Sequence, residues 1–485
     1  MPNSGFDRIN ASFNTSGKYG KRLTVNGKVM YSNEKTKNRP WLSDSPGSGV
    51  NSMYFVPNDL DIRDLIGDPN SPGAVPSLAM QQDMGITIRD GKSPGEEYWL
   101  SNDIYAQNPY WAAYHYKTSD TRDRIISSGQ MRFNITDYLY VDGTVGIDWY
   151  ARKWNRIVPQ GTGYRRAGQL REGINTQREV NLQAMLGFNK VFGKIGVNAF
   201  VGGARMRANG ESVEMQGEGF NTPFLEVASN ATSKNYTYGY WAAGINSVFG
   251  SAEFSYNDYL FITATARQDW FSVLNPEVNG ILYPSIGGSF VFTDAIKTIP
   301  SWLSFGKVRA SWAQVGNAAS VNAYSTNLLY SASSTHIGRG GGVVPLGDNT
   351  STTTFPNPQL KPFTSTETEV GFDIRLFNNR VGLDFAYYSQ NTTDDILYPG
   401  VSNASGFSNT AVNVGKLTNR GIEFLLSVTP VKRKDNLGCF AELCKEQEQC
   451  GEPSPWSDNH GRRRSTDIYS RYSAYCRPSL RHDRR

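Results

Sequence analysis

The sequence lacks long hydrophobic runs. No window of its 485 residues approaches the ~18 continuous apolar residues of a membrane-spanning helix, and the mean hydropathy is −0.48. These values exclude a helical membrane protein. They do not exclude a transmembrane β-barrel, because the polar side chains that face the lumen of a barrel lower the average hydropathy.

The residues that usually build metal sites are scarce. The four histidines, His115, His336, His460 and His482, lie far apart, and none of the four cysteines occurs before Cys439. No cysteine pair has the two-residue spacing of a zinc site. We therefore predict that the protein binds no metal and no cofactor.

The signatures of an enzyme are also missing. Residues Gly338–Gly342 are rich in glycine, but the Gly-Lys-Ser/Thr ending of a phosphate-binding loop does not follow them. The acidic pairs Glu96–Glu97 and Asp394–Asp395 fall in polar segments expected to be loops, where charge needs no catalytic explanation. We predict no catalytic residue, and the sequence leaves the substrate-binding residues unknown.

Charge of one sign is not concentrated anywhere. The net charge of +5 comes from scattered lysines and arginines, without the basic face that nucleic-acid binding requires. The first residues, from Met1 to about Val29, contain neither an apolar core nor a small-residue cleavage site, so no signal peptide is predicted.

What the sequence does contain is alternation of apolar and polar residues. Thr366–Phe377 and Arg380–Gln390 alternate with period two and are separated only by Asn378-Asn379, which predicts a β-hairpin. Similar patterns predict strands in several other segments: 130–135, 139–152, 182–188, 195–201, 236–256, 260–267, 285–292, 307–313 and 422–428. A weak pattern between Phe6 and Ser32 suggests a further turn at Asn26-Gly27.

The predicted connections fall into two classes. Short turns (136–137, 189–194, 257–258 and 378–379) alternate along the chain with long polar loops (33–108, 158–175, 208–235 and 324–356). An outer-membrane barrel has short turns at one end and long loops at the other, whereas a soluble sandwich has no reason to separate them. The predicted fold is all-β: a partial antiparallel transmembrane β-barrel with long extracellular loops.

Aromatic residues mark two further features. Many lie near predicted strand ends, where a barrel places its interfacial girdles, although strands favour aromatics in general: Tyr138, Trp149, Tyr150, Trp154, Tyr256, Tyr259, Trp270, Trp302, Trp312, Tyr387 and Tyr388. A second group could stack on sugars or simply pack its own loop: Tyr98, Trp99, Tyr105, Tyr110, Trp111 and Tyr114.

Several motifs resemble a known family. The segments 254–260, 266–269, 283–285 and 307–312 resemble the barrel of TonB-dependent outer-membrane receptors. The runs Asn357-Pro358-Gln359-Leu360-Lys361-Pro362, Glu369-Val370-Gly371-Phe372-Asp373 and Asn419-Arg420-Gly421-Ile422-Glu423 are similar to its SusC/RagA branch. The resemblance covers roughly residues 2–430.

This resemblance implies a function. The family forms barrels of about 22 strands closed by an N-terminal plug, in the outer membrane of Gram-negative, Bacteroidetes-like bacteria. It implies import of oligosaccharides, or of peptides, with a SusD-like surface lipoprotein and the TonB–ExbB–ExbD complex as partners and outer-membrane lipid around the barrel. The chain shows no TonB box or plug, so we expect it to begin inside the barrel.

The end of the chain departs from the family. We predict a barrel region at residues 1–430 and an aberrant tail at 431–485, which contains all four cysteines and an arginine cluster. Reading the tail one base over permits an alternating strand, so a frameshift near Asp435 or Asn436 is one hypothesis and a disordered extension is the other.

Two other functions stay open at this point. One is a TonB-dependent receptor for a siderophore or cobalamin. The other is a soluble β-rich protein that binds carbohydrate or mediates adhesion.

Overall fold

The fold is described from a computed structural model covering residues 3–39, 41, 45–85, 92–98, 103–296, 298–318, 321–324, 326–327, 330–333, 342–345, 354–405, 407–431, 437–450 and 468–478. One antiparallel sheet of fifteen strands dominates these residues. In sheet order the strands are β1 (Gly5–Tyr19), β2 (Leu23–Lys37), β3 (Lys117–Asn134), β4 (Leu139–Val158), β5 (Gln169–Phe192), β6 (Ile195–Phe220), β7 (Ala231–Tyr256), β8 (Leu260–Phe271), β9 (Gly280–Val291), β10 (Leu303–Asn317), β14 (Phe363–Leu376), β15 (Val381–Thr393), β19 (Lys416–Val431), β20 (Leu437–Cys450) and β21 (Ile468–Pro478).

The remaining elements are short and lie between these strands. They are α1 (Gly49–Tyr54), η1 (Ile62–Ile66), α2 (Leu78–Asp83), α3 (Pro109–Tyr114), η2 (Ala228–Asn230), α4 (Phe292–Ala295), β11 (Tyr330–Ser333), β12 (Gly342–Pro345), β13 (Thr354–Phe355), β16 (Ile396–Leu397), η3 (Asn403–Ser405), β17 (Asn409–Thr410) and β18 (Val412–Asn413). Across the described residues, no helix has the length and apolar character needed to cross a membrane.

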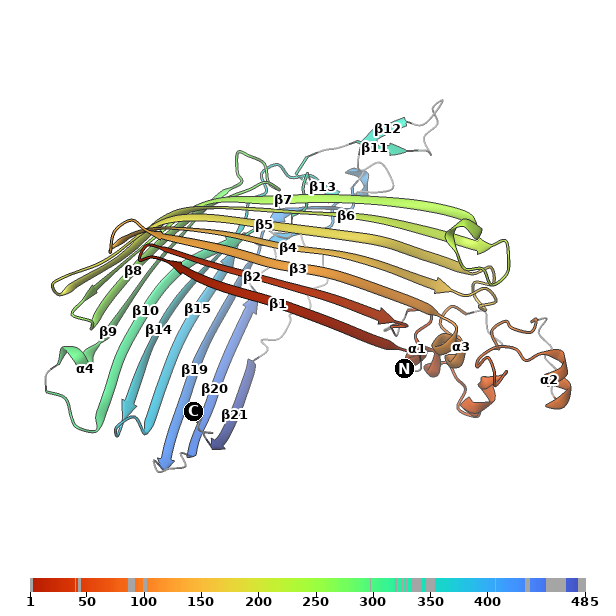
Figure 1. The fold of residues 1–485 in the computed structure, drawn as a ribbon, viewed down its shortest axis with the longest axis horizontal. Helices are drawn as coiled ribbons and strands as arrows, with labels where there is room; N and C mark the ends of the chain where they lie inside the picture. The colour runs from red at the N-terminus through yellow and green to blue at the C-terminus, as the bar shows by residue number, and fades with distance from the viewer. Residues whose placement is uncertain are drawn as a thin grey trace.

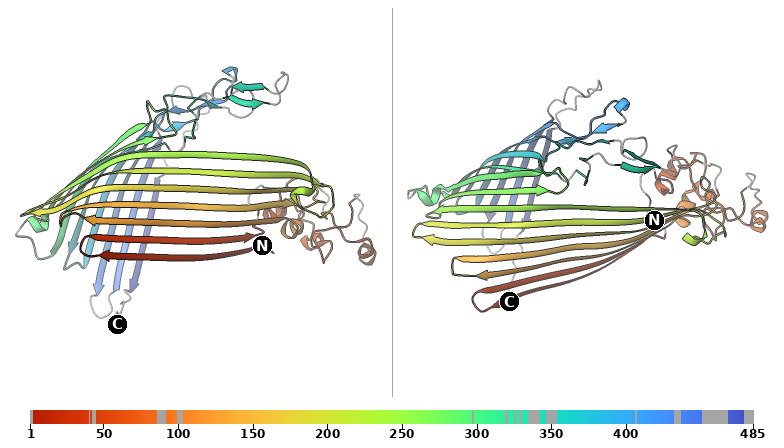
Figure 2. Two further views of the ribbon diagram at one scale, coloured as in Figure 1. Left: turned by 45° about the horizontal axis from the view of Figure 1, so that its top comes forward. Right: turned by 90° about the horizontal axis from the view of Figure 1, so that it is seen from above.

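Sheet order follows chain order, so each strand pairs with the next sheet strand along the chain. In Figure 1, β1 to β7 run almost horizontally and β14 to β21 run steeply, and the views of Figure 2 show the same strongly curled sheet. Within the described part of the chain, β1 and β21 each pair on one side only, so the sheet is an open segment of a barrel. The predicted partial antiparallel barrel is confirmed.

The connections separate to opposite ends of the sheet, as predicted. Short turns join the strands at one end, at residues 20–22, 135–138, 193–194, 257–259 and 377–380. The helices α1, α2 and α3 gather at the other end, beyond β2 and β3 (Figure 1). The longest connection at the turn end is 292–302, which contains α4.

Left-handed backbone closes several of the turns. Asn257 and Asp258 have φ of 54° and 59°, and Phe377, Asn378 and Asn379 have φ of 54°, 53° and 62°. Asparagine and aspartate tolerate this region better than other residues with a side chain. The hairpin predicted at Asn378-Asn379 is therefore confirmed, with a turn two residues longer than expected.

Several predicted boundaries were wrong, including the turn predicted at 189–194, which is shorter because β5 continues to Phe192. Asn26 and Gly27 do not form a turn, because they pair with Gln130 and Gly129 inside the sheet. The loops predicted at 158–175 and 208–235 are shorter, since β5 begins at Gln169, β6 continues to Phe220 and β7 begins at Ala231. Apolar side chains such as Leu170 and Met215 are scattered among polar ones in these strand ends, so the backbone ladder continues beyond the regular apolar alternation.

Register divides the sheet into an apolar face and a polar face. Partners across adjacent strands share a face, and alternate residues along one strand take opposite faces. Leu139, Val141, Val145, Ile147 and Trp149 of β4 share the apolar face with Leu182 and Leu186 of β5. Most of these side chains are exposed, with 43% exposure at Leu186, and Leu139 and Trp149 are half-buried. Such a surface fits lipid hydrocarbon.

The apolar band covers only part of each long strand. In β6, the positions on the apolar face run Ile195, Val197, Ala199, Val201 and Gly203, and then change to Arg205. This band matches the ~9–11 residues of a membrane-spanning strand, whereas β6 and β7 each have 26 residues. The band lies beside the short turns, so the long ends and their loops project on the side where outer-membrane barrels face the cell exterior.

The predicted girdle aromatics divide between the two faces. Trp149, Tyr256, Trp312 and Tyr387 occupy the apolar face, but Tyr150, Trp154 and Tyr388 occupy the polar face and cannot belong to a lipid-facing girdle. A side chain one position farther along a strand points the opposite way, which proximity to a strand end does not reveal.

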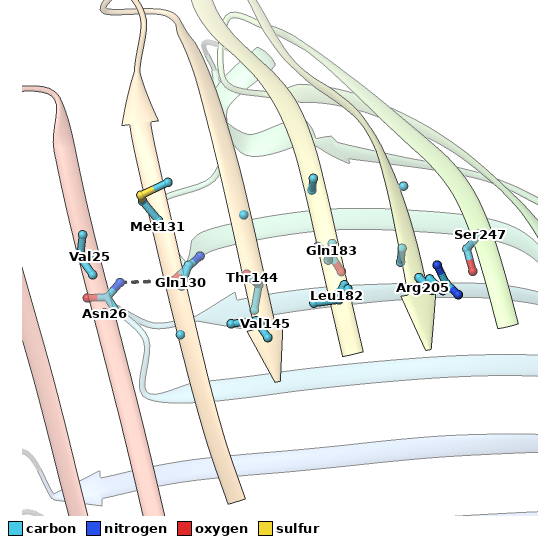
Figure 3. Close-up of a pocket in the computed structure, with 15 residues that line it drawn as sticks. Val25, Asn26, Gln130, Met131, Thr144, Val145, Leu182, Gln183, Arg205 and Ser247 are labelled. Carbon is cyan, nitrogen blue, oxygen red and sulfur yellow. Dashed lines mark hydrogen bonds between the residues drawn. The ribbon is translucent and has the colours of Figure 1, made fainter. Parts of the chain in front are cut away.

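A shallow groove of about 670 Å³ crosses the apolar face (Figure 3). Its floor is a row of small register partners, Gly143, Ala184 and Gly203, and larger side chains such as Met131, Val145 and Leu182 stand beside it. Because it lies within the apolar band, this groove faces lipid rather than the interior of the barrel.

Most buried apolar side chains lie in the loops and in the strand ends beside them. One cluster contains Trp111, Ala112, Tyr116 and Val158, and another surrounds Leu360 beneath the loops that follow β8, β10 and β15. The loop end is thus a packed structure of its own.

The sheet continues past residue 430. β20 and β21 fall within the predicted tail, and β20 pairs with β19 along most of its length. The boundary at 430 and the frameshift hypothesis stay predictions.

The two faces generate a testable difference. Leu186→Lys places a charge in the apolar band and should cost about 2–4 kcal/mol of folding free energy in a bilayer. Gln183→Lys, on the polar face of the same strand, should change it by less than about 1 kcal/mol. Urea unfolding of the receptor in lipid vesicles measures both, and equal losses would contradict the assignment of faces.

Candidate ligand-binding site

The polar face is lined by ion pairs between neighbouring strands. Glu34 of β2 accepts from Arg8 at 3.4 Å and Arg122 at 2.7 Å, and Arg309 of β10 contacts both Glu369 and Asp384 at 3.2 Å. Further pairs are Arg124–Asp148, Arg152–Asp120 and Arg171–Glu214. Such half-exposed pairs contribute little stability each, but together they make a polar wall with most charges matched.

Hydrogen bonds of amide and indole side chains also connect the same wall. Asn26 donates to Gln130, whose amide donates to Asp142, and Trp154 Nε1 donates to Asn175 Oδ1 at 2.8 Å. The strands of the wall are therefore tied together by side chains as well as by the backbone.

Aromatic rings on this face lie over glycines of the adjacent strand. Four register pairs share the arrangement: Tyr140/Gly187, Trp154/Gly173, Trp241/Gly210 and Tyr388/Gly421. A Cβ added at each glycine would meet the ring of its partner. The glycines therefore let the rings lie close against the wall instead of standing into the interior.

Glu97 organises the loop end of the molecule. It is 1% exposed, and its two carboxylate oxygens accept from the backbone N–H of Asn108 at 2.7 Å and of Gly163 at 2.6 Å. Burial raises the pKa of the Glu97 carboxyl above its ordinary value, although the two backbone donors oppose the shift. Glu97 thus joins segment 92–98 to α3 and to the loop after β4.

The predicted aromatic run divides between packing and exposure. Trp111 is 1% exposed, stacks on His115 with ring centroids 4.0 Å apart, and donates from Nε1 to Thr162, so it packs the loop. Tyr105 and Tyr114 are 38% and 39% exposed, Tyr98 and Tyr110 are half-buried, and Trp99 lies outside the described residues. The packing alternative therefore holds for Trp111.

A pocket of about 330 Å³ lies where the polar wall meets the loops. Its floor comes from β2, β3 and β4, and residues just after β2 cover it. The lining side chains that carry charge or aromatic rings are Arg39, Trp41, Asp120, Arg152, Trp154 and Arg156. Three of the four charged groups are arginines, so the pocket is cationic.

Arg156 is the central cation of this pocket. Its guanidinium carbon lies 5.6 Å from the Trp154 ring and 5.9 Å from the Trp41 ring, within the range of cation–π attraction. Trp41 is held in turn by an edge contact with Tyr116, whose hydroxyl donates to Gln107. Arg152 differs because it is paired with Asp120, at 2.7 Å from Nε to Oδ2.

No local sequence pattern indicates this pocket. Arg39 and Arg156 are remote along the chain, and only the pairing of β2, β3 and β4 brings their segments together. Trp154 was expected in a girdle, whereas the register turns it toward the pocket.

Metal-binding groups do not converge in the described residues: no group of three His, Cys, Asp or Glu could hold an ion there. His115 stacks on Trp111 and its Nε2 lies 3.1 Å from the Pro72 carbonyl, which gives it a packing role.

Comparison with known proteins identifies the family. Residues 57–472 match the family described as TonB dependent receptor-like, beta-barrel. The chain belongs to this family. The predicted resemblance to TonB-dependent receptors is confirmed, and such receptors are transport proteins of the outer membrane.

Curated relatives are TonB-dependent receptors from Formosa agariphila. Receptor P26 is 29% identical over 279 residues, which is 56% of this chain and 27% of P26. Receptor P3 is 26% identical over 370 residues, covering 73% of this chain and 35% of P3. The chain therefore spans about a third or less of the relatives it matches.

Solved structures share the fold. The RagAB peptide transporter matches 93% of this chain and 48% of its own, with a TM-score of 0.77 and 17% identity. The ferric-catecholate import receptor Fiu from E. coli K12 matches 92% of this chain and 58% of its own, with a TM-score of 0.51 and 10% identity.

The role of Glu97 can be tested through pH. Folding raises the pKa of Glu97, so protonation of this carboxyl stabilises the packed loop. The stabilisation is complete below the ordinary carboxyl pKa and is lost as pH rises through the raised pKa. Hydrogen exchange at the Asn108 and Gly163 amides, corrected for intrinsic rates, should therefore show protection falling from pH 5 to pH 8.

Glu97→Gln should abolish this pH dependence. It should also lower protection by about 1–3 kcal/mol, because an amide N–H₂ would face one of the two backbone donors. Glu96→Gln, at the half-exposed neighbour, is the matched control, and an unchanged pH profile in Glu97→Gln would contradict the assignment.

Proposed function

We propose that this chain is part of a TonB-dependent importer that takes oligosaccharides, or peptides, across the outer membrane. The observation that carries the proposal is the match of residues 57–472 to the receptor barrel family. A polar wall of matched charges, which a polar solute can pass without being trapped, supports a transport role.

The nature of the cargo is supported by fold similarity. RagAB, by its name a peptide transporter, has a TM-score of 0.77 against 0.51 for the ferric-catecholate receptor. This difference favours a nutrient importer over a siderophore or cobalamin receptor. Membership of an outer-membrane receptor family does not favour a soluble adhesion protein.

The partners belong to the same proposal. A SusD-like surface lipoprotein would cover the loop end, where α1, α2 and α3 lie, and the TonB–ExbB–ExbD complex would supply energy from the inner membrane. Neither contact requires an enzyme activity of this chain.

Uptake in the native cell tests the proposal. Cells with the gene deleted should lose growth on the oligosaccharide or peptide mixture that induces it, and deletion of tonB should have the same effect. Growth on ferric chelates under iron limitation is the control and should not change. Loss of iron uptake with unchanged growth on the mixture would replace the proposal by the siderophore function.

A tagged receptor tests the partner. Purification in mild detergent should recover a SusD-like lipoprotein in about equal amount. Recovery of the receptor without any surface lipoprotein would contradict this part of the proposal.

A further inference from the structure

We propose that the pocket around Arg156 binds an anionic group, a carboxylate or a sulfate carried by a sugar, so that the transported ligand is an acidic oligosaccharide. The inference deepens the proposed import function and rests on it for the role of the ligand. Binding itself can be measured without transport.

The first argument is unmatched positive charge. Along the polar wall, Arg8, Arg122, Arg124, Arg152, Arg171 and Arg309 all have carboxylate partners. Arg39 and Arg156 have neither an ion pair nor a hydrogen bond from their side chains within the described ranges, although both line the pocket. Two guanidinium groups in one small pocket attract an anion.

The second argument is the state of the Arg156 donors. Contacts with the rings of Trp41 and Trp154 stabilise its charge but provide no conventional hydrogen-bond acceptor. A guanidinium has five N–H donors in a planar fork that matches the two oxygens of a carboxylate or sulfate. The rings therefore hold in place a cation whose preferred partner is absent from the described residues.

The third argument is an orphan hydroxyl. Thr118 lines the same pocket, and its Oγ1 is buried without a hydrogen-bond partner among the described residues. A buried hydroxyl without a partner is costly, so such groups normally have one. A ligand oxygen in the pocket would satisfy it.

Sugar is favoured over peptide by the two indole rings and the size of the pocket. The apolar face of a sugar ring packs on tryptophan, while its hydroxyls and acidic group need donors at the rim. About 330 Å³ is at the lower end of small-molecule sites, so the pocket suits one acidic sugar residue of a longer chain.

Binding to the complete receptor in detergent tests the proposal. Calorimetry would use tetragalacturonate and a sulfated κ-carrageenan tetrasaccharide as anionic probes, with cellotetraose as the neutral probe. At least one anionic probe should bind 10-fold more tightly than cellotetraose, and its affinity should fall as salt rises.

Variants assign the binding to this pocket. Arg156→Gln should weaken the anionic probe about 10- to 100-fold, the range expected for loss of a charged hydrogen-bond pair. Arg156→Lys should recover part of the loss, because it restores the charge but not the planar fork. Lys153→Gln removes one charge from the opposite face of the same strand and should leave the affinity unchanged.

The outcomes separate this inference from the proposed function. Equal binding of neutral and anionic probes, binding of neither anionic probe, or an Arg156→Gln receptor with unchanged affinity would overturn the acidic-sugar site. If tetra-alanine with a free carboxylate bound more tightly than its amidated form and than both anionic sugars, the ligand of the pocket would be a peptide rather than a sugar. A third outcome is that the receptor binds an anionic probe, that Arg156→Gln removes this binding, and that cells show no TonB-dependent uptake. This outcome would support the site and overturn the import function.

Discussion

Backbone pairing is the constraint on which the rest of this structure depends. Inside a bilayer every N–H and C=O needs a protein partner, and a continuous antiparallel ladder supplies them between neighbouring strands. The ladder then fixes the face of every side chain, because a slip of one residue would exchange the two faces. The row Asn26, Gln130, Thr144, Gln183 shows the result: four polar partners on consecutive strands share the face opposite Leu182.

The length of β5, β6 and β7 follows from what the two halves of each strand contact. Near the turns, one face contacts lipid and must be apolar. Beyond Arg205 of β6 no such demand exists, so polar side chains occur on both faces, and the loops can pack against apolar residues such as Met215. Glu97 and Trp111 belong to that packed layer, where burial of a carboxylate and an indole is possible because their polar atoms find backbone and hydroxyl partners.

This division explains what the sequence could and could not predict. Alternation in Leu139–Trp149 and the asparagines at 378–379 report local geometry, so the hairpins and the two ends of the sheet were predictable. The outer part of β6 has no alternation, and its strand was missed. Whether an aromatic residue faces lipid or the interior depends on its place in the alternation along the strand. Trp149 therefore lies on the apolar face and its neighbour Tyr150 on the polar face. The Arg156 pocket joins remote segments, and no local pattern encodes it.

The distribution of charge along the polar wall has a consequence for transport. A solute must bind well enough to enter and weakly enough to leave. Toward the turns, Arg124 and Arg309 are neutralised by carboxylates, so they hold an anion weakly. At the loop end, Arg156 contacts two indole rings instead, which keep it in place without cancelling its charge. The Arg156 pocket thereby offers attraction for an anion where a ligand would first meet the barrel interior.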